Sequence, residues 1–138
     1  MNMKKRVLIL CTGNSCRSQM AEGILRQLAG DKFEVFSAGT KPSEVNKTAI
    51  KIMKEINIDI SHHRSKHVNE FQGQRFDYVI TVCDNAKESC PFFPGETKVL
   101  HFPFPDPPHA KAENEVTLNE FRKVRDMILN KFQEFAAF

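Results

Sequence analysis

Residues 7–18 read Val-Leu-Ile-Leu-Cys-Thr-Gly-Asn-Ser-Cys-Arg-Ser, and this stretch decides the fold. The four apolar residues at 7–10 are typical of a strand that is buried on both faces of a parallel sheet. A short polar loop follows them, and an amphipathic helical pattern begins directly after the loop. Such a loop turns backbone N–H groups inward at the amino end of the helix, where they bind a tetrahedral oxyanion.

Two side chains of this stretch carry its chemistry. Cys11 ends the strand, and Arg17 follows six positions later at the start of the helix. Because the N–H groups favour a thiolate, we expect Cys11 to have a lowered pKa and to be nucleophilic. The guanidinium of Arg17 can hold two oxygens of one oxyanion. The predicted oxyanion-binding residues are Thr12, Gly13, Asn14, Ser15, Cys16, Arg17 and Ser18.

Two alternatives exist for this loop. A cysteine after an apolar strand is often a small buried hydrophobic residue without chemistry. A nucleotide-binding Walker loop is excluded, because no Gly-Lys-Ser/Thr follows the strand.

Composition and charge narrow the class of protein. A chain of 138 residues buries one core, so we expect a single domain over residues 1–138. Its 20 basic and 17 acidic residues are interspersed, and we expect no nucleic-acid surface. No apolar run approaches about 18 residues, so we expect no membrane contact. The first apolar run is too short for a signal peptide, which predicts a cytoplasmic protein.

The cysteines are Cys11, Cys16, Cys83 and Cys90. In a reducing compartment, cysteines are more often catalytic, redox-active or metal-binding than structural. Because these spacings match none of the usual zinc sites, we expect no metal. Nucleophilic or redox chemistry is therefore the interpretation that we follow.

Strands alternate with helices along the chain. The apolar patterns predict strands at 7–10, 33–38, 76–82 and 98–102 and helices at 20–28, 44–56 and 118–135. This alternation is typical of an α/β fold, here a four-stranded parallel sheet with helices on both faces. Active sites of such folds lie at the carboxyl ends of the strands.

Three segments converge at that edge of the predicted sheet. Cys11 ends the first strand, Cys83 ends the third, and the proline-rich loop 103–108 follows the fourth. Prolines on both sides of Asp106 stiffen its backbone, which suits a general acid at the mouth of an oxyanion site. The alternative for Asp106 is a surface Asp-Pro turn.

Cys90 follows Cys83 by seven residues, in a segment that breaks at Pro91. If residues 84–90 are helical, the two cysteines lie about 10 Å apart along the helix axis. A disulfide requires Cα atoms within about 7 Å, so a bond between them requires the segment to unwind. The alternative is a pair of unrelated thiols.

Taken together, these motifs resemble a known family. The sequence from Cys11 to Gly23, the Cys83…Cys90-Pro91 segment and Asp106-Pro107 are similar to the thioredoxin-coupled arsenate reductases. Those proteins share the fold of the low-molecular-weight protein tyrosine phosphatases. The resemblance covers essentially the whole chain.

The resemblance implies a relay of three cysteines. Cys11 attacks arsenate, Cys83 attacks Cys11 and releases arsenite, and Cys90 attacks Cys83 to form a disulfide that thioredoxin reduces. It also implies that Arg17 grips the oxyanion and that Asp106 protonates the leaving oxygen.

Further roles follow from the same resemblance. Asn14 holds the shape of the loop, and Ser18 stabilises the Cys11 thiolate. We expect arsenate and thioredoxin as partners, no cofactor, and a monomer. Glutaredoxin stays open as an alternative donor.

The second interpretation is a tyrosine phosphatase, which needs only Cys11, Arg17 and Asp106. Those phosphatases usually carry proline at the position of Gln19 and tyrosines after the Asp-Pro, where this chain has Pro108 and His109. A third interpretation, an oxyanion sensor, needs neither Asp106 nor a cysteine pair.

Some of the reductases bind potassium beside the loop, through residues that match Asn14, Glu22 and Ser37 and an aspartate. This chain has Lys66 at the position of the aspartate. We therefore predict that the Lys66 ammonium replaces potassium; the alternative is a solvated surface charge.

Overall fold

The computed structural model describes residues 4–84, 86, 90–91, 93–108 and 113–137. Its elements are β1 (Lys5–Cys11), α1 (Arg17–Ala29), β2 (Phe33–Gly39), α2 (Lys47–Lys54), the 3-10 helix η1 (Val68–Phe71), β3 (Tyr78–Thr81), β4 (Lys98–His101) and α4 (Glu115–Ala136). The strands form one parallel sheet in the order β2-β1-β3-β4. The predicted four-stranded parallel α/β fold is confirmed.

Strand β1 lies at the centre of the sheet because its apolar run has no polar face. It pairs with β2 on one side and β3 on the other, and residues 7–10 are fully buried. The carboxyl end of this buried strand is where the polar loop begins, so the loop rests on the most rigid part of the fold.

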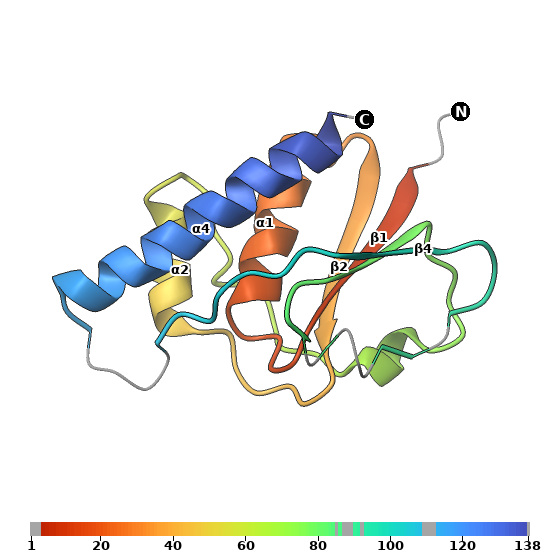
Figure 1. Ribbon diagram of the computed structural model, residues 1–138, viewed down its shortest axis with the longest axis horizontal. Helices are drawn as coiled ribbons and strands as arrows, with labels where there is room; N and C mark the ends of the chain where they lie inside the picture. The colour runs from red at the N-terminus through yellow and green to blue at the C-terminus, as the bar shows by residue number, and fades with distance from the viewer. Residues whose placement is uncertain (1–3, 85, 87–89, 92, 109–112, 138) are drawn as a thin grey trace.

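The two faces of the sheet are covered differently (Figure 1). Ser37 of β2 points to α1, where it bonds Glu22, and α1, α2 and α4 lie together on that side. The neighbouring Phe36 points to the other face, where its ring packs on Phe71 of η1 and on Phe76. Among the described helices, none is both long and apolar enough to cross a membrane.

The C-terminal helix begins earlier than its apolar pattern, which spans residues 118–135. Its first turn is polar, and Asn114 forms a capping box in which its side chain and that of Thr117 each accept the other's backbone N–H. Apolar spacing cannot detect such a turn. Helix α2 likewise begins directly after its own cap residue, Asn46.

Strand β2 ends against the loop that follows β1. A Cβ atom at Gly39 would lie 2.4 Å from the Thr12 carbonyl oxygen, so only glycine allows this approach. Because all four strands are parallel, their carboxyl ends lie at one edge of the sheet. This is the edge at which the sequence predicts the site.

Candidate active site

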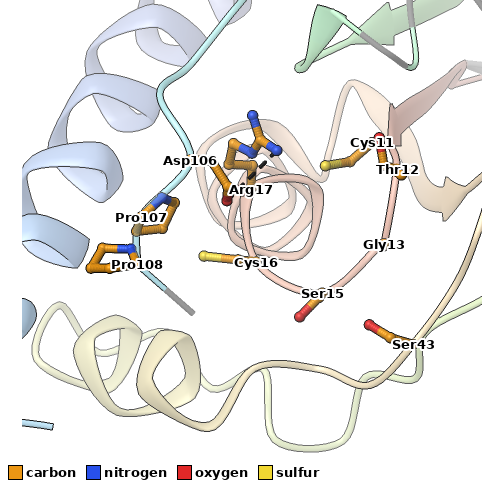
Figure 2. A pocket seen from close by; sticks show the side chains of 10 residues that line it. All are labelled: Cys11, Thr12, Gly13, Ser15, Cys16, Arg17, Ser43, Asp106, Pro107 and Pro108. Atoms are coloured by element: carbon orange, nitrogen blue, oxygen red, sulfur yellow. Dashed lines mark ion pairs between the residues drawn. The ribbon is translucent and has the colours of Figure 1, made fainter. Parts of the chain in front are cut away.

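A pocket of about 600 Å³ opens at this edge (Figure 2). It is lined by Cys11, Thr12, Gly13, Ser15, Cys16, Arg17, Ser43, Asp106, Pro107 and Pro108. The predicted nucleophile, cation and carboxylate therefore surround one space. Asn14 and Ser18, which the sequence also places in the oxyanion site, lie behind the loop and are fully buried.

The loop between β1 and α1, which we call the phosphate loop (residues 11–17), turns its carbonyl groups away from the pocket. The carbonyls of Cys11, Thr12, Gly13 and Ser15 accept the backbone N–H groups of Thr40, Lys41, Ser43 and Asn46, at 2.9 to 3.3 Å. In a trans peptide, the N–H group points opposite to the carbonyl. The N–H groups of the loop therefore face inward, as an oxyanion cradle requires.

Asn14 fixes the sharpest bend of the loop. Its φ of 47° lies in the left-handed region, which asparagine tolerates better than most residues. Its amide nitrogen donates to Ser18 Oγ and Ser37 Oγ at 2.8 and 3.0 Å, and its amide oxygen accepts the backbone N–H of Lys66 at 2.9 Å. These bonds tie the loop to α1, β2 and the segment before η1.

Arg17 links the phosphate loop to the proline-rich loop after β4. Its guanidinium donates to the Phe104 carbonyl oxygen at 3.0 Å and lies 3.6 Å from Asp106 Oδ1. The Asp106 carboxylate is about half-exposed and reaches the pocket from its own loop (Figure 2). Phe104 and Asp106 thus hold Arg17 in place, which reduces the reorganisation needed when an anion binds.

Cys11, which lines the pocket, forms a pair with Cys83, and each thiol shifts the pKa of the other. They are only 4% and 5% exposed, and Thr12 Oγ1 lies 3.3 Å from Cys83 Sγ. The bond from Cys11 lowers the pKa of Cys83 to about 5, with help from Thr12, the Ala86 N–H and Arg17. The same bond, together with burial, raises the pKa of Cys11 against the effect of Arg17.

The expected lowering of the Cys11 pKa is therefore wrong, because Cys83 and burial raise it. The two neighbouring thiols shift each other's pKa in opposite directions, so ionisation is favoured at Cys83 rather than at Cys11. The loop motif alone does not include the second thiol, which lies in the segment after β3. The Ser18 hydroxyl accepts from Asn14, and its role toward Cys11 stays a prediction.

The other two cysteines differ from this pair. Burial and the Asp106 carboxylate raise the pKa of Cys16, so its thiol stays protonated in the loop. Cys90 is half-buried, donates to the Pro91 carbonyl at 3.6 Å, and has a pKa that burial raises. All four are free thiols. Whether residues 84–90 are helical is not tested, because residues 85 and 87–89 lie outside the described residues.

The sequence analysis did not assign the structural role that Gln19 and its partner His63 have. The Gln19 amide donates to the carbonyls of Asn14 and Arg64, at 3.1 and 3.0 Å, and its oxygen lies 2.9 Å from His63 Nδ1. It thereby joins the phosphate loop to the segment that carries Lys66. No spacing in the sequence pairs residues so far apart in the chain.

Comparison with known proteins identifies the family. The model of the low molecular weight phosphotyrosine protein phosphatases matches residues 6–137. The chain belongs to this family. Within it, the chain is 44% identical to "Arsenate reductase" of Halalkalibacterium halodurans, and the match covers 96% of each chain.

Solved structures of this phosphatase-like family support the same placement. "An arsenate reductase in oxidized state" superposes with a TM-score of 0.82 at 32% identity, covering 96% of this chain and 97% of that one. A thioredoxin-dependent arsenate reductase of Corynebacterium glutamicum gives 0.71 at 26% identity, covering 96% of this chain and 60% of that one.

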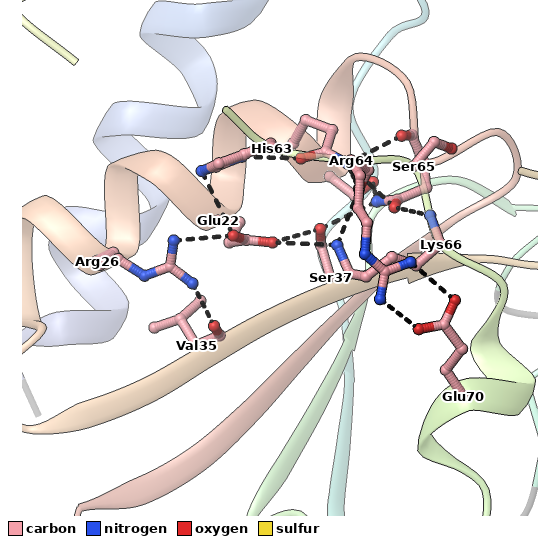
Figure 3. A network of polar contacts seen from close by, with 12 residues as sticks. Glu22, Arg26, Val35, Ser37, His63, Arg64, Ser65, Lys66 and Glu70 are labelled. Atoms are coloured by element: carbon pink, nitrogen blue, oxygen red, sulfur yellow. Dashed lines mark hydrogen bonds and ion pairs between the residues drawn. The ribbon is translucent and has the colours of Figure 1, made fainter. Parts of the chain in front are cut away.

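Behind the phosphate loop, the buried carboxylate of Glu22 is surrounded by basic side chains (Figure 3). Glu22 accepts the Ser37 hydroxyl at 2.6 Å and pairs with Arg26 at 2.9 Å. The Lys66 ammonium lies 3.9 Å from Glu22 and donates to the Arg64 carbonyl at 3.0 Å, with its side chain only 12% exposed. Lys66 is therefore not a solvated charge, and these residues do not fit a potassium ion.

We expect thermal stability and arsenate turnover to be the same in potassium and sodium salts at equal ionic strength. The tethered ammonium of Lys66 already supplies the positive charge beside Glu22. Melting curves and steady-state rates in the two salts measure this. A potassium-specific rise in Tm of the wild type would contradict the prediction.

Lys66→Asp is the informative variant for this comparison. It places a carboxylate beside Glu22, so potassium should now raise its Tm relative to sodium. Arg64→Ala, which removes an exposed side chain paired with Glu70, serves as the control and should stay insensitive.

Proposed function

We propose that the chain reduces arsenate to arsenite with thioredoxin as electron donor, through disulfides formed in turn by Cys11, Cys83 and Cys90. The observation that carries this proposal is the position of Cys83 against the phosphate loop next to Cys11, with its sulfur 3.3 Å from Thr12 Oγ1. Hydrolysis of a phosphate ester needs one cysteine, whereas a two-electron reduction needs a second thiol beside the first. The proposal takes residues 1–138 as one domain that acts as a cytoplasmic monomer.

In the first step, the phosphate loop and Arg17 bind arsenate, and the Cys11 sulfur attacks arsenic. The Cys11 proton passes across the hydrogen bond to the Cys83 thiolate. Asp106 donates a proton to the leaving oxygen, which departs as water. An S–As bond replaces an As–O bond, and arsenic stays in the +5 state.

In the second step, Cys83 releases to solvent the proton that it took from Cys11, and its thiolate attacks the Cys11 sulfur. The S–As electron pair goes to arsenic, which leaves as arsenite in the +3 state while the two thiols become a disulfide. Thr12, the Ala86 N–H and Arg17 also lower the pKa of Cys83, and they remain in place when the Cys11 sulfur is bonded to arsenic, so they favour the thiolate that this attack requires. Cys90 then attacks Cys83 and frees Cys11, and thioredoxin reduces the Cys83–Cys90 bond.

The direct test couples arsenate to NADPH consumption through thioredoxin and thioredoxin reductase. A parallel assay follows hydrolysis of p-nitrophenyl phosphate, and glutaredoxin with glutathione replaces thioredoxin in a third arm. We expect arsenate-dependent oxidation of NADPH in the thioredoxin arm. Efficient ester hydrolysis without that oxidation would instead favour a phosphatase.

A weak phosphatase activity is the second candidate, because the pocket is far larger than one oxyanion. Cys11, Arg17 and Asp106 supply the groups that ester hydrolysis needs. However, none of the described lining residues is aromatic, so little there can stack on a phenyl ring. We therefore expect this activity to be minor.

Asp106→Asn should slow the first step by about 100-fold or more, because a positioned general acid contributes about 10²–10⁴-fold. Arsenate affinity should change little, since Arg17 is also held by Phe104. Single-turnover release of arsenite measures the step, and calorimetry measures binding.

Asp126→Asn is the matched control for this variant. Asp126 is an aspartate of α4 with the same degree of exposure, 57% against 55% for Asp106, and it pairs with Arg125 away from the pocket. It should behave like the wild type. If Asp106→Asn released arsenite at the wild-type rate under conditions in which the first step limits the rate, Asp106 would not be a general acid but only part of a turn.

A further inference from the structure

His101 makes two contacts at the carboxyl end of β4 that the proposed chemistry does not use. Its Nδ1 lies 2.7 Å from the hydroxyl of Thr81, the residue paired with it on β3. Its Nε2 lies 2.9 Å from Asp84 Oδ1. Asp84 directly follows Cys83, so the ring connects β4 to the chain beside a reactive thiol.

The contact to Asp84 persists in either charge state of the imidazole. When His101 is neutral, the Thr81 hydroxyl donates to Nδ1 and the hydrogen lies on Nε2. When His101 is protonated, Nδ1–H donates to Thr81, whose hydroxyl can turn to the Leu100 carbonyl 3.4 Å away. In both states Nε2–H donates to the Asp84 carboxylate.

We propose that His101 is a positioning residue which holds Asp84 and thereby keeps Cys83 against the phosphate loop. This inference rests on the proposed relay. Cys83 must stay beside Cys11 and Thr12 to release arsenite. It must then leave Thr12 when the Cys90 thiolate attacks it, a step that forms the Cys83–Cys90 bond and returns the electron pair to Cys11 as a thiolate.

The contact between His101 and Asp84 stabilises the position of Cys83 beside Cys11 and Thr12, relative to the position in which Cys83 bonds to Cys90. Asp84 is 87% exposed, so solvent screens the pair and its loss should change rates by about 3-fold. Cys83 is already held by Cys11, Thr12 and the Ala86 N–H, so arsenite release should stay within about 2-fold of the wild type. Transfer of the disulfide to Cys90 should become about 3-fold faster.

The experiment uses His101→Ala, Asp84→Ala and the double variant. In each, rapid alkylation and peptide mapping follow the two disulfides after one addition of arsenate, and hydrogen exchange follows the Ala86 amide. That amide is buried and bonded to Cys83, so it reports the departure of Cys83 without any turnover. We expect about 3-fold faster exchange and equal effects of the three variants, since each removes the same contact.

Two controls separate positioning from general loosening. Asp84→Asn keeps an oxygen that accepts from Nε2–H and should restore most of the wild-type behaviour. Lys51→Ala breaks an exposed ion pair with Glu113 elsewhere and should change nothing. Slower formation of both disulfides in the alanine variants would indicate structural damage and overturn the proposal.

The remaining outcomes also test the proposal that His101 positions Cys83. Unchanged Ala86 exchange would overturn the proposal, and so would faster exchange with an unchanged rate of transfer to Cys90. If the wild type forms no Cys83–Cys90 disulfide, the proposed function is wrong. The exchange rate of the Ala86 amide still tests whether the contact between His101 and Asp84 holds Cys83 in place.

Discussion

Cys11→Ser is expected to abolish both arsenate reduction and ester hydrolysis. A serine hydroxyl is not ionised near neutral pH even beside Arg17, and it cannot form the disulfide that releases arsenite. The loss should exceed about 10³-fold, as for other nucleophiles removed from a cooperating set of groups. Arsenate should still bind, because the N–H groups of the phosphate loop and Arg17 are unchanged.

The matched control for this experiment is Cys16→Ser. Cys16 lies in the same loop, is equally buried, and has a pKa that its surroundings raise, so its thiol is not a competing nucleophile. This variant should keep activity within about tenfold, the cost of a buried hydroxyl. Thioredoxin-coupled rates and calorimetric binding of arsenate measure both variants. Appreciable reduction by Cys11→Ser would exclude Cys11 as the nucleophile.

The sheet could be predicted because each strand is marked by a short apolar stretch of the sequence. The apolar run 7–10 has no polar face, and such a run fits only a central strand. Parallel strands then bring Cys11, Cys83 and Asp106 to one edge without any further information. Helix boundaries were less certain, since the first turn of α4 is polar and depends on the Asn114 cap.

Contacts between distant segments could not be predicted. The clamp on the phosphate loop comes from backbone N–H groups at residues 40–46, which have no signature in side chains. The ionisation of Cys11 depends on Cys83, 72 positions away, so the loop motif alone gave the wrong direction. The prediction for Lys66 rested on an aligned position, and its ammonium does lie beside Glu22.

Cys90→Ser is expected to end catalysis after a single turnover. Cys11 and Cys83 can still act once, so arsenate should release about one arsenite per enzyme and leave the Cys11–Cys83 disulfide. Both cysteines are buried, whereas Cys90 is half-buried, so thioredoxin should reach the trapped bond poorly. Steady-state turnover with thioredoxin should therefore fall by about two orders of magnitude or more.

Ester hydrolysis gives this variant its internal control, since it requires neither Cys83 nor Cys90. The reduced Cys90→Ser protein should hydrolyse p-nitrophenyl phosphate at the wild-type rate, and Cys16→Ser should show that removing one thiol is not enough to stop turnover. Peptide mapping after arsenate should find Cys11–Cys83 in Cys90→Ser and Cys83–Cys90 in the wild type. Full thioredoxin-coupled turnover by Cys90→Ser would refute the three-thiol relay and require a mechanism in which Cys11 and Cys83 suffice.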